Sequence, residues 1–302
     1  MENEFDLTNL IYISGAEVND GNVLICCQYK EFNFNTHPHT VYRVFTKKGE
    51  EIDLGHNERA TSGITRSITN NGVVALDPKG EFLEYQSNEE YLRNNILEDY
   101  VDLRLTFRFI KLIGDTLYAG GTNNYIFSFT NDKWTEIGID DMRKEPAPMS
   151  FENITGFHKE ELYIFGWKGV IWTNSSGEWK KSSSPTKYIL NDGDVHNEDV
   201  YIAGQSGTIL RGRNDKWEII PNNENNYDIW SVQSYGDSIY FATVNGILRL
   251  KDDKLTLFKE LSPDMRTTMN LFVGPSGLWS VGESDIAVYD GNQWKTFKQN
   301  LK

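Results

Sequence analysis

A short apolar phrase that returns along the chain at nearly constant spacing limits the possible folds more than any other feature. It reads LYAGG, LYIFG, VYIAG, IYFAT and LWSVG, and it begins at Leu117, Leu162, Val200, Ile239 and Leu278. The differences between successive positions are 45, 38, 39 and 39 residues. This is the length of one blade in a β-propeller. We therefore interpret the phrase as the same strand in successive copies of one structural unit.

Two further columns of residues define the rest of the unit. About seven residues into each copy stands a Gly, Asn or Asp, residue types that tolerate positive φ and mark a tight turn before another strand. About 16 or 17 residues into each copy a large apolar residue follows a polar turn, at Trp134, Trp179, Trp217, Leu255 and Trp294. With the apolar run that precedes each phrase, every unit has four strands. We expect the tryptophans to pack one unit against its neighbour, because a buried indole has a single polar atom to satisfy.

The pattern continues upstream in weaker form. Val73 and Val23 occupy the first position of the phrase, which raises the count to seven units. One unit cannot bury both of its faces, whereas a closed ring of units buries them. The sequence therefore predicts an all-β fold, a seven-bladed β-propeller with four-stranded antiparallel blades in a single domain over 1–302. The expected blades are about 9–55, 60–105, 107–138, 150–183, 188–220, 227–258 and 266–297. Within the second, the stretch 87–105 has helical character and is expected to cap a blade.

The composition restricts the partners and the compartment. The chain has 302 residues with 44 Asp and Glu against 30 Lys and Arg, a net charge of −14. This excess argues against binding of nucleic acid or an anionic membrane, because both require cations that neutralise phosphates. No apolar run approaches the ~18 residues of a membrane span, and the first residues lack the positive charge of an export signal. Cys26 and Cys27 are adjacent, so we expect free thiols and a soluble cytoplasmic protein.

The repeats resemble known propeller repeats. Copies with a GxxGxI turn, a polar turn and then Trp resemble the bacterial-neuraminidase-repeat-like propellers, including the photosystem assembly factor type. The segment GLWSVGESDIAVYDGNQWKTF at 277–297 is similar to the repeats of two-component-regulator sensor propellers. The resemblance covers 107–297 and implies the propeller fold. It does not imply one activity, because propellers carry many unrelated functions.

No motif indicates an enzyme. GQSGT at 204–208 occupies the turn of a unit and not the strand-to-helix turn of a nucleophilic serine. His37 and His39 alone provide too few ligands for zinc. We therefore expect no cofactor. One alternative is a calcium-dependent hydrolase or lyase with its metal on the ring axis, because amide and carboxylate oxygens suit calcium. The candidate ligands, near the start of innermost strands, are Asn153, Asn191, Asp192 and Asn270.

Acidic and aromatic residues occur together in the loops of one expected face. The connections between blades share this face with the turns that follow the repeated phrase. Carboxylates there would attract a basic partner while buried aromatic side chains would provide the affinity. The candidate partner-binding residues are Asp140, Asp141, Glu145, Phe151, Trp167, Glu224, Tyr227, Asp228 and Trp230.

The leading hypothesis is a noncatalytic binding protein whose acidic loop face captures a basic protein. Its specific form is a bacterial immunity protein that occludes the active site of a basic toxin, because opposite charge accelerates such an association. Beside the calcium-dependent enzyme, a further alternative is a small-ligand or glycan sensor. In that alternative Trp167 and Trp230 stack on a sugar.

Overall fold

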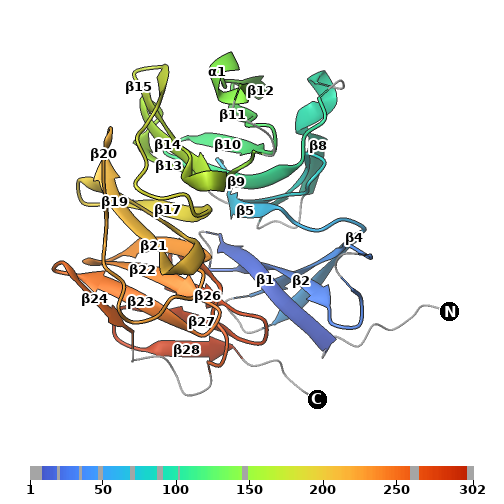
Figure 1. Ribbon diagram of the computed structural model, residues 1–302. Helices are drawn as coiled ribbons and strands as arrows, with labels where there is room; N and C mark the ends of the chain where they lie inside the picture. Colours follow the sequence, from blue (N-terminus) through green and yellow to red (C-terminus); the bar gives the residue numbers. More distant parts are fainter. Residues whose placement is uncertain are drawn as a thin grey trace.

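In a computed structural model, the chain forms a ring of antiparallel sheets around a common axis (Figure 1). The structure describes residues 9–18, 21–33, 36–46, 50–68, 72–86, 91–100, 103–144, 149–258 and 265–297. Within these ranges there are seven sheets of four strands, and each sheet contains four strands consecutive in the sequence. This confirms the predicted seven-bladed, all-β propeller.

The first three blades cover the part of the chain where the repeat is weakest. Blade 1 contains β1 (Leu10–Glu17), β2 (Val23–Tyr29), β3 (Thr40–Phe45) and β4 (Glu51–Asn57). Blade 2 contains β5 (Gly63–Arg66), β6 (Gly72–Leu76), β7 (Glu81–Gln86) and β8 (Tyr91–Asn95), followed by the 3-10 helix η2 (Ile96–Asp99). Blade 3 contains β9 (Phe107–Ile113), β10 (Thr116–Gly121), β11 (Ile126–Thr130) and β12 (Lys133–Glu136), followed by α1 (Asp140–Arg143).

The other four blades follow the repeat closely. Blade 4 contains β13 (Phe151–His158), β14 (Glu161–Gly166), η3 (Trp167–Gly169), β15 (Ile171–Ser175) and β16 (Glu178–Lys181). Blade 5 contains β17 (Leu190–His196), β18 (Asp199–Gly204), η4 (Gln205–Gly207), β19 (Ile209–Arg213) and β20 (Lys216–Ile219). Blade 6 contains β21 (Ser231–Tyr235), β22 (Ser238–Thr243), β23 (Gly246–Lys251) and β24 (Lys254–Leu257). Blade 7 contains β25 (Asn270–Gly274), β26 (Gly277–Val281), β27 (Ile286–Tyr289) and β28 (Trp294–Phe297).

The stretch 87–105 does not form the helix that the sequence predicts. Its central part, β8, pairs with β7 and completes the sheet of blade 2, and only the short η2 follows it. Strand pairing decides the structure here, because β7 would otherwise present an unpaired edge. The first blade also extends two residues past its expected end at 55, to Asn57 in β4.

The tryptophans of blades 3, 4, 5 and 7 pack on the preceding blade, as the sequence predicts. The indole Nε1 of Trp179 in blade 4 donates a hydrogen bond of 3.0 Å to the carbonyl oxygen of Ile137, which follows blade 3. Ring contacts between successive blades, with centroids 5.8 to 6.2 Å apart, join Trp134 to Phe82, Trp217 to Tyr163 and Trp294 to Phe258. The hydrophobic core is therefore a series of apolar layers between blades.

The ring closes without exchange of a strand between the first and last blades. Instead β1 contacts β25 and β26 directly. At this junction the carboxylate of Glu17 accepts hydrogen bonds from the indole N–H of Trp279 at 2.8 Å and the backbone N–H of Ser276 at 3.0 Å. The hydroxyl of Ser276 donates a third hydrogen bond. Glu17 is fully buried, so one internal carboxylate links blade 1 to blade 7.

Candidate functional site

Two kinds of connection meet on one side of the ring, which we call the loop face. They are the turns between the second and third strands, including η3 and η4, and the connections that lead from one blade to the next. In η3 and η4, Lys168 and Ser206 have φ of 58° and 55°, and the glycines that follow have φ of 69° and 67°. A Cβ on Gly169 would lie 2.2 Å from the carbonyl oxygen of Thr186. Glycine therefore lets this turn pack on the neighbouring connection.

Asp140 and Asp141, two of the predicted partner-binding residues, are exposed on α1, which lies beside β12 at the outer edge of the ring (Figure 1). Each carboxylate has a cationic neighbour. Asp140 accepts a hydrogen bond from Arg143 at 2.9 Å, and Asp141 accepts one from Lys144 at 2.6 Å. This part of the loop face thus carries mixed charge. Glu145 lies outside the described residues.

Phe151 is a core residue and not an exposed one. It begins β13, is fully buried, and belongs to the apolar layer that also contains Met142 and Ile154. The sequence placed it correctly at the end of a connection. However, the first residue of an inner strand turns toward the neighbouring blade and not toward solvent. We therefore remove Phe151 from the candidate contact residues.

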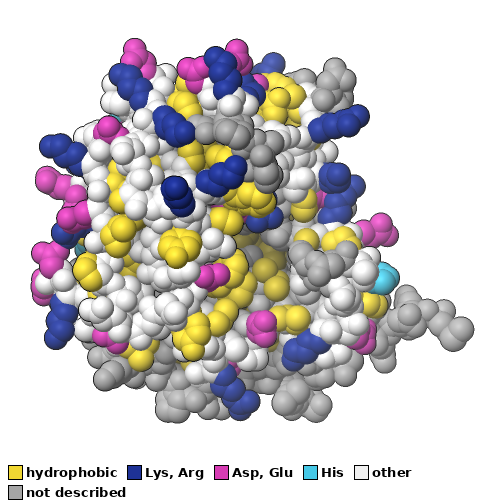
Figure 2. Space-filling model, in the orientation of Figure 1, with side chains coloured by type: hydrophobic (Ala, Val, Ile, Leu, Met, Phe, Trp, Pro, Cys, Tyr) yellow, Lys and Arg dark blue, Asp and Glu magenta, His cyan; other side chains and the backbone are white. Residues whose placement is uncertain are grey.

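Large apolar side chains are exposed in the connections and turns of blades 4 to 6. Tyr227 and Trp230 are 49% and 42% exposed. Tyr188, in the connection from blade 4 to blade 5, and Val244, in the turn between β22 and β23, are exposed to a similar extent. Sequence reasoning missed both. Figure 2 shows hydrophobic side chains around a central hollow, with both signs of charge dispersed over the surface. Large apolar side chains in solvent are the usual anchors of a protein interface.

The remaining predicted residues are fixed by local hydrogen bonds. Trp167, in η3, is half-buried, and its Nε1 donates to Glu152 at 2.6 Å. Asp228 accepts a hydrogen bond of 2.8 Å from the backbone N–H of Ser206 in η4, which attaches the 220–230 connection to blade 5. Glu224 is exposed in the same connection. The structure therefore brings Glu224, Tyr227, Asp228 and Trp230 into one connection, separate from α1.

Exposed carboxylates also recur on the opposite side of the ring, in the turns between first and second strands and between third and fourth strands. Sequence reasoning missed them because it compared the loops of one face only. The signal was the repeated acidic residue of the phrases IGD, HKE, HNE, YGD, NDK and DDK. These exposed residues include Asp115, Asp132, Glu160, Glu178, Glu198, Asp215, Asp237, Asp252, Asp253 and Asp290.

A cavity of about 480 Å³ lies along the ring axis and is lined by the innermost strands of the blades. Its charged lining consists of Arg66, Arg108, Lys111, Asp192 and Asp194, and Trp230 also contributes to the lining. Because Trp230 is substantially exposed, the cavity reaches the surface beside it.

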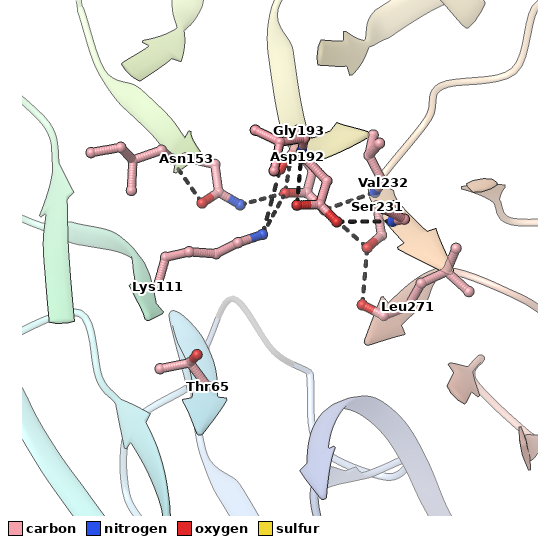
Figure 3. A network of polar contacts seen from close by, with 12 residues as sticks. Thr65, Lys111, Asn153, Asp192, Gly193, Ser231, Val232 and Leu271 are labelled. Atoms are coloured by element: carbon pink, nitrogen blue, oxygen red, sulfur yellow. Dashed lines mark hydrogen bonds and ion pairs between the residues drawn. The ribbon is translucent and has the colours of Figure 1, made fainter. Parts of the chain in front are cut away.

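Lys111 extends from blade 3 past Asn153 of blade 4 toward blade 5 (Figure 3). Its Nζ lies 3.6 Å from Oδ1 of Asp192 and 3.5 Å from the carbonyl oxygen of Gly193. Burial opposes the charged form of Lys111, but the carboxylates of Asp192 and Asp194 outweigh this and raise its pKa. Burial raises the pKa of Asp194 in turn, partly offset by Lys111. A lysine inside the apolar run FRFIKLI was the sequence signal for this position.

Asp192 connects three blades. Its Oδ1 accepts from the side-chain amide of Asn153 at 2.8 Å, and its Oδ2 accepts from the hydroxyl of Ser231 at 3.0 Å and the backbone N–H of Val232 at 2.8 Å (Figure 3). Both carboxylate oxygens are thus engaged by donors from blades 4 and 6. This arrangement orders the inner strands around the axis.

The four candidate calcium ligands are brought together only in part. Asn153 and Asp192 are hydrogen-bonded to each other, whereas the amide of Asn191 donates to the carbonyl oxygen of Ile229 at 2.9 Å. Asn270 lines the cavity. Within the described ranges there is no group of three His, Cys, Asp or Glu side chains that could hold a metal ion.

These features define the class of the protein: a β-propeller with a partly apolar loop face and a polar axial cavity. Solved structures of similar fold include a streptogramin B lyase, with a TM-score of 0.66 and 15% identity over 80% of this chain and 84% of that one. Another is the extracellular domain of the hybrid two-component system BT4673 from B. thetaiotaomicron, with a TM-score of 0.67 and 14% identity over 100% of this chain and 39% of that one. These likenesses show the fold.

Among sequences, the chain is 31% identical over 206 residues to the Immune protein Tsi7 of Pseudomonas aeruginosa. The match covers 65% of this chain and 66% of that relative, just under two thirds of its length. No protein-family model matches the chain. In the described part of the structure no helix has the length and apolar character to cross a membrane.

Proposed function

We propose that this chain is an immunity protein, a noncatalytic propeller that binds a toxin and blocks its action. The observation that carries this proposal is the 31% identity to the Immune protein Tsi7. The propeller supports it, because a rigid ring with a broad loop face suits recognition of another protein. The same proposal places the protein in the cytoplasm, where its free, buried cysteines remain reduced.

We assign toxin binding to the loop face, with the exposed side chains Tyr188, Tyr227, Trp230 and Val244 as apolar anchors. Aromatic anchors surrounded by polar groups provide most of the affinity of protein interfaces. The carboxylates Asp140, Asp141, Glu224 and Asp228 border this region. They would speed the approach of a basic toxin, and together with the net charge of −14 they favour a basic partner.

The test begins with capture of the cognate toxin from the native host by the purified chain. The captured protein is then expressed in a bacterial host with and without this chain. We expect growth to stop when the toxin is expressed alone and to recover when the chain is expressed with it. Failure of the chain to restore growth, or to bind any protein that is toxic on expression, would overturn the immunity function.

Two matched variants test the surface separately. The loop-face variant carries Asp140→Asn, Asp141→Asn, Glu224→Gln and Asp228→Asn. The control carries Asp115→Asn, Glu160→Gln, Glu178→Gln and Glu198→Gln on the opposite side, with the same change in net charge. We expect association with the toxin to slow about tenfold or more in the first variant and little in the control. Equal effects, or a larger effect in the control, would refute the loop-face assignment and leave the immunity function standing.

A further inference from the structure

The charged groups of the axial cavity balance one another. Lys111 lies close to Asp192 and Asp194, and the mouth residue Arg108 forms an ion pair with Glu152 at 2.9 Å. Arg66 lines the same cavity. A charged ligand would bring an additional charge without a counter-ion into a partly desolvated space, which costs free energy. The balance therefore favours a neutral ligand.

The cavity also contains polar groups with unused hydrogen-bonding capacity. Gln233 and Asn270 are half-buried in its lining, and within the described ranges their side-chain amides have no hydrogen-bond partner. Each amide can both donate and accept. Lys111 has three N–H donors, and among the described residues its Nζ makes two long contacts, at 3.5 and 3.6 Å. A ligand that satisfies these groups must both accept and donate hydrogen bonds, as a hydroxyl group does.

An aromatic surface stands beside these groups. Trp230 lines the cavity and is 42% exposed, so its ring is accessible where the cavity meets the solvent. Met269 lines the cavity next to Asn270 in the sequence. The volume of about 480 Å³ falls within the range of small-molecule sites, roughly 300–1,000 Å³. The site thus combines an apolar platform with amides and an ammonium group.

From this combination we propose that the axial cavity binds a neutral, polyhydroxylated ligand, namely a neutral sugar. The apolar face of the sugar ring lies against Trp230, its hydroxyls exchange hydrogen bonds with Gln233 and Asn270, and one hydroxyl accepts from Lys111. This binding activity is additional to the proposed immunity function and does not depend on it. The two sites share Trp230, which belongs both to the loop face and to the cavity lining, whereas Lys111, Gln233 and Asn270 line the cavity and are not among the proposed toxin anchors.

Isothermal titration calorimetry of the full chain tests the proposal. The probes are glucose, galactose, mannose and maltose, titrated to roughly 50 mM to detect millimolar affinities. Glucosamine and glucuronate are matched charged probes, since each differs from glucose by one ionised group. We expect saturable binding of at least one neutral sugar that raised salt does not change, and at least tenfold weaker binding of glucosamine and glucuronate. The proposal is overturned if no neutral probe binds saturably. It is also overturned if a charged probe binds as tightly as the neutral sugars or more tightly.

Three variants locate the site. Trp230→Ala and Gln233→Leu remove the platform and one amide, and both side chains are partly solvent-accessible, so the fold should persist. Tyr188→Ala is the control, because Tyr188 is an exposed aromatic side chain on the same face that does not line the cavity. We expect at least tenfold weaker sugar binding in the first two variants and none of this loss in the control, with melting temperatures checked for each. Unchanged binding in Trp230→Ala and Gln233→Leu would refute the axial site. Because Trp230 is also a proposed toxin anchor, Gln233→Leu separates the two functions: it should weaken sugar binding and leave toxin binding unchanged.

Discussion

Replacement of Glu17 tests how the propeller ring is held closed. Its fully buried carboxylate is the acceptor for the indole N–H of Trp279 and for the backbone N–H and hydroxyl of Ser276. Glu17→Ala would leave the buried indole N–H of Trp279 and the partly buried backbone N–H of Ser276 without their acceptor. An unsatisfied buried group costs about 1–3 kcal/mol, water can reach the N–H of the exposed Ser276, and some space is left unfilled as well. We therefore expect a loss of about 2–4 kcal/mol in the free energy of unfolding.

Urea denaturation followed by tryptophan fluorescence measures this loss. Glu17→Gln retains one acceptor oxygen but turns an NH₂ group toward a donor, so we expect an intermediate loss of about 1–2 kcal/mol. Glu178→Ala, at a strongly exposed position, is the control, with a change within about 0.5 kcal/mol. Ser276→Ala combined with Glu17→Ala should cost less than the sum of the single changes. A loss below about 1 kcal/mol in Glu17→Ala would show that the ring does not depend on this carboxylate.

Two further predictions concern contacts between blades. The hydrogen bonds from Arg213 hold the pKa of Glu161 below its usual value, so this contribution to stability is present above about pH 4.3 and is lost as the pH falls through the lower folded pKa. The melting temperature of Glu161→Gln should therefore lie below that of the wild type at pH 7 and approach it as the pH falls below the folded pKa of Glu161; a constant difference would contradict this. Trp179→Phe removes the donor to Ile137, whereas Trp134 Nε1 has no partner in the described part of the chain. In urea denaturation, Trp179→Phe should lower the free energy of unfolding by about 1 kcal/mol more than Trp134→Phe does. Equal losses would contradict the stabilising role of the hydrogen bond to Ile137.

The fold could be predicted because each blade repeats a local pattern. Strand positions, the turn glycines and the tryptophan column are set within about 40 residues, so the phrase beginning at Leu162 specifies the same unit as the one beginning at Leu278. The stretch 87–105 was misjudged because its local pattern gives way to pairing of β8 with β7. Phe151 was misjudged because its direction depends on the neighbouring blade and not on its own connection.

The sequence by itself determined the number of blades, their four strands and the acidic net charge, since these depend on short-range periodicity and on composition. Only the tertiary structure decided which residues meet across the ring. Glu17 and Ser276 are 259 positions apart, and Lys111 and Gly193 are 82 positions apart. Such contacts depend on the angle at which successive blades pack, to which every blade between them contributes. A local pattern cannot specify them, and for this reason the axial cavity and the ring junction became visible only in the folded molecule.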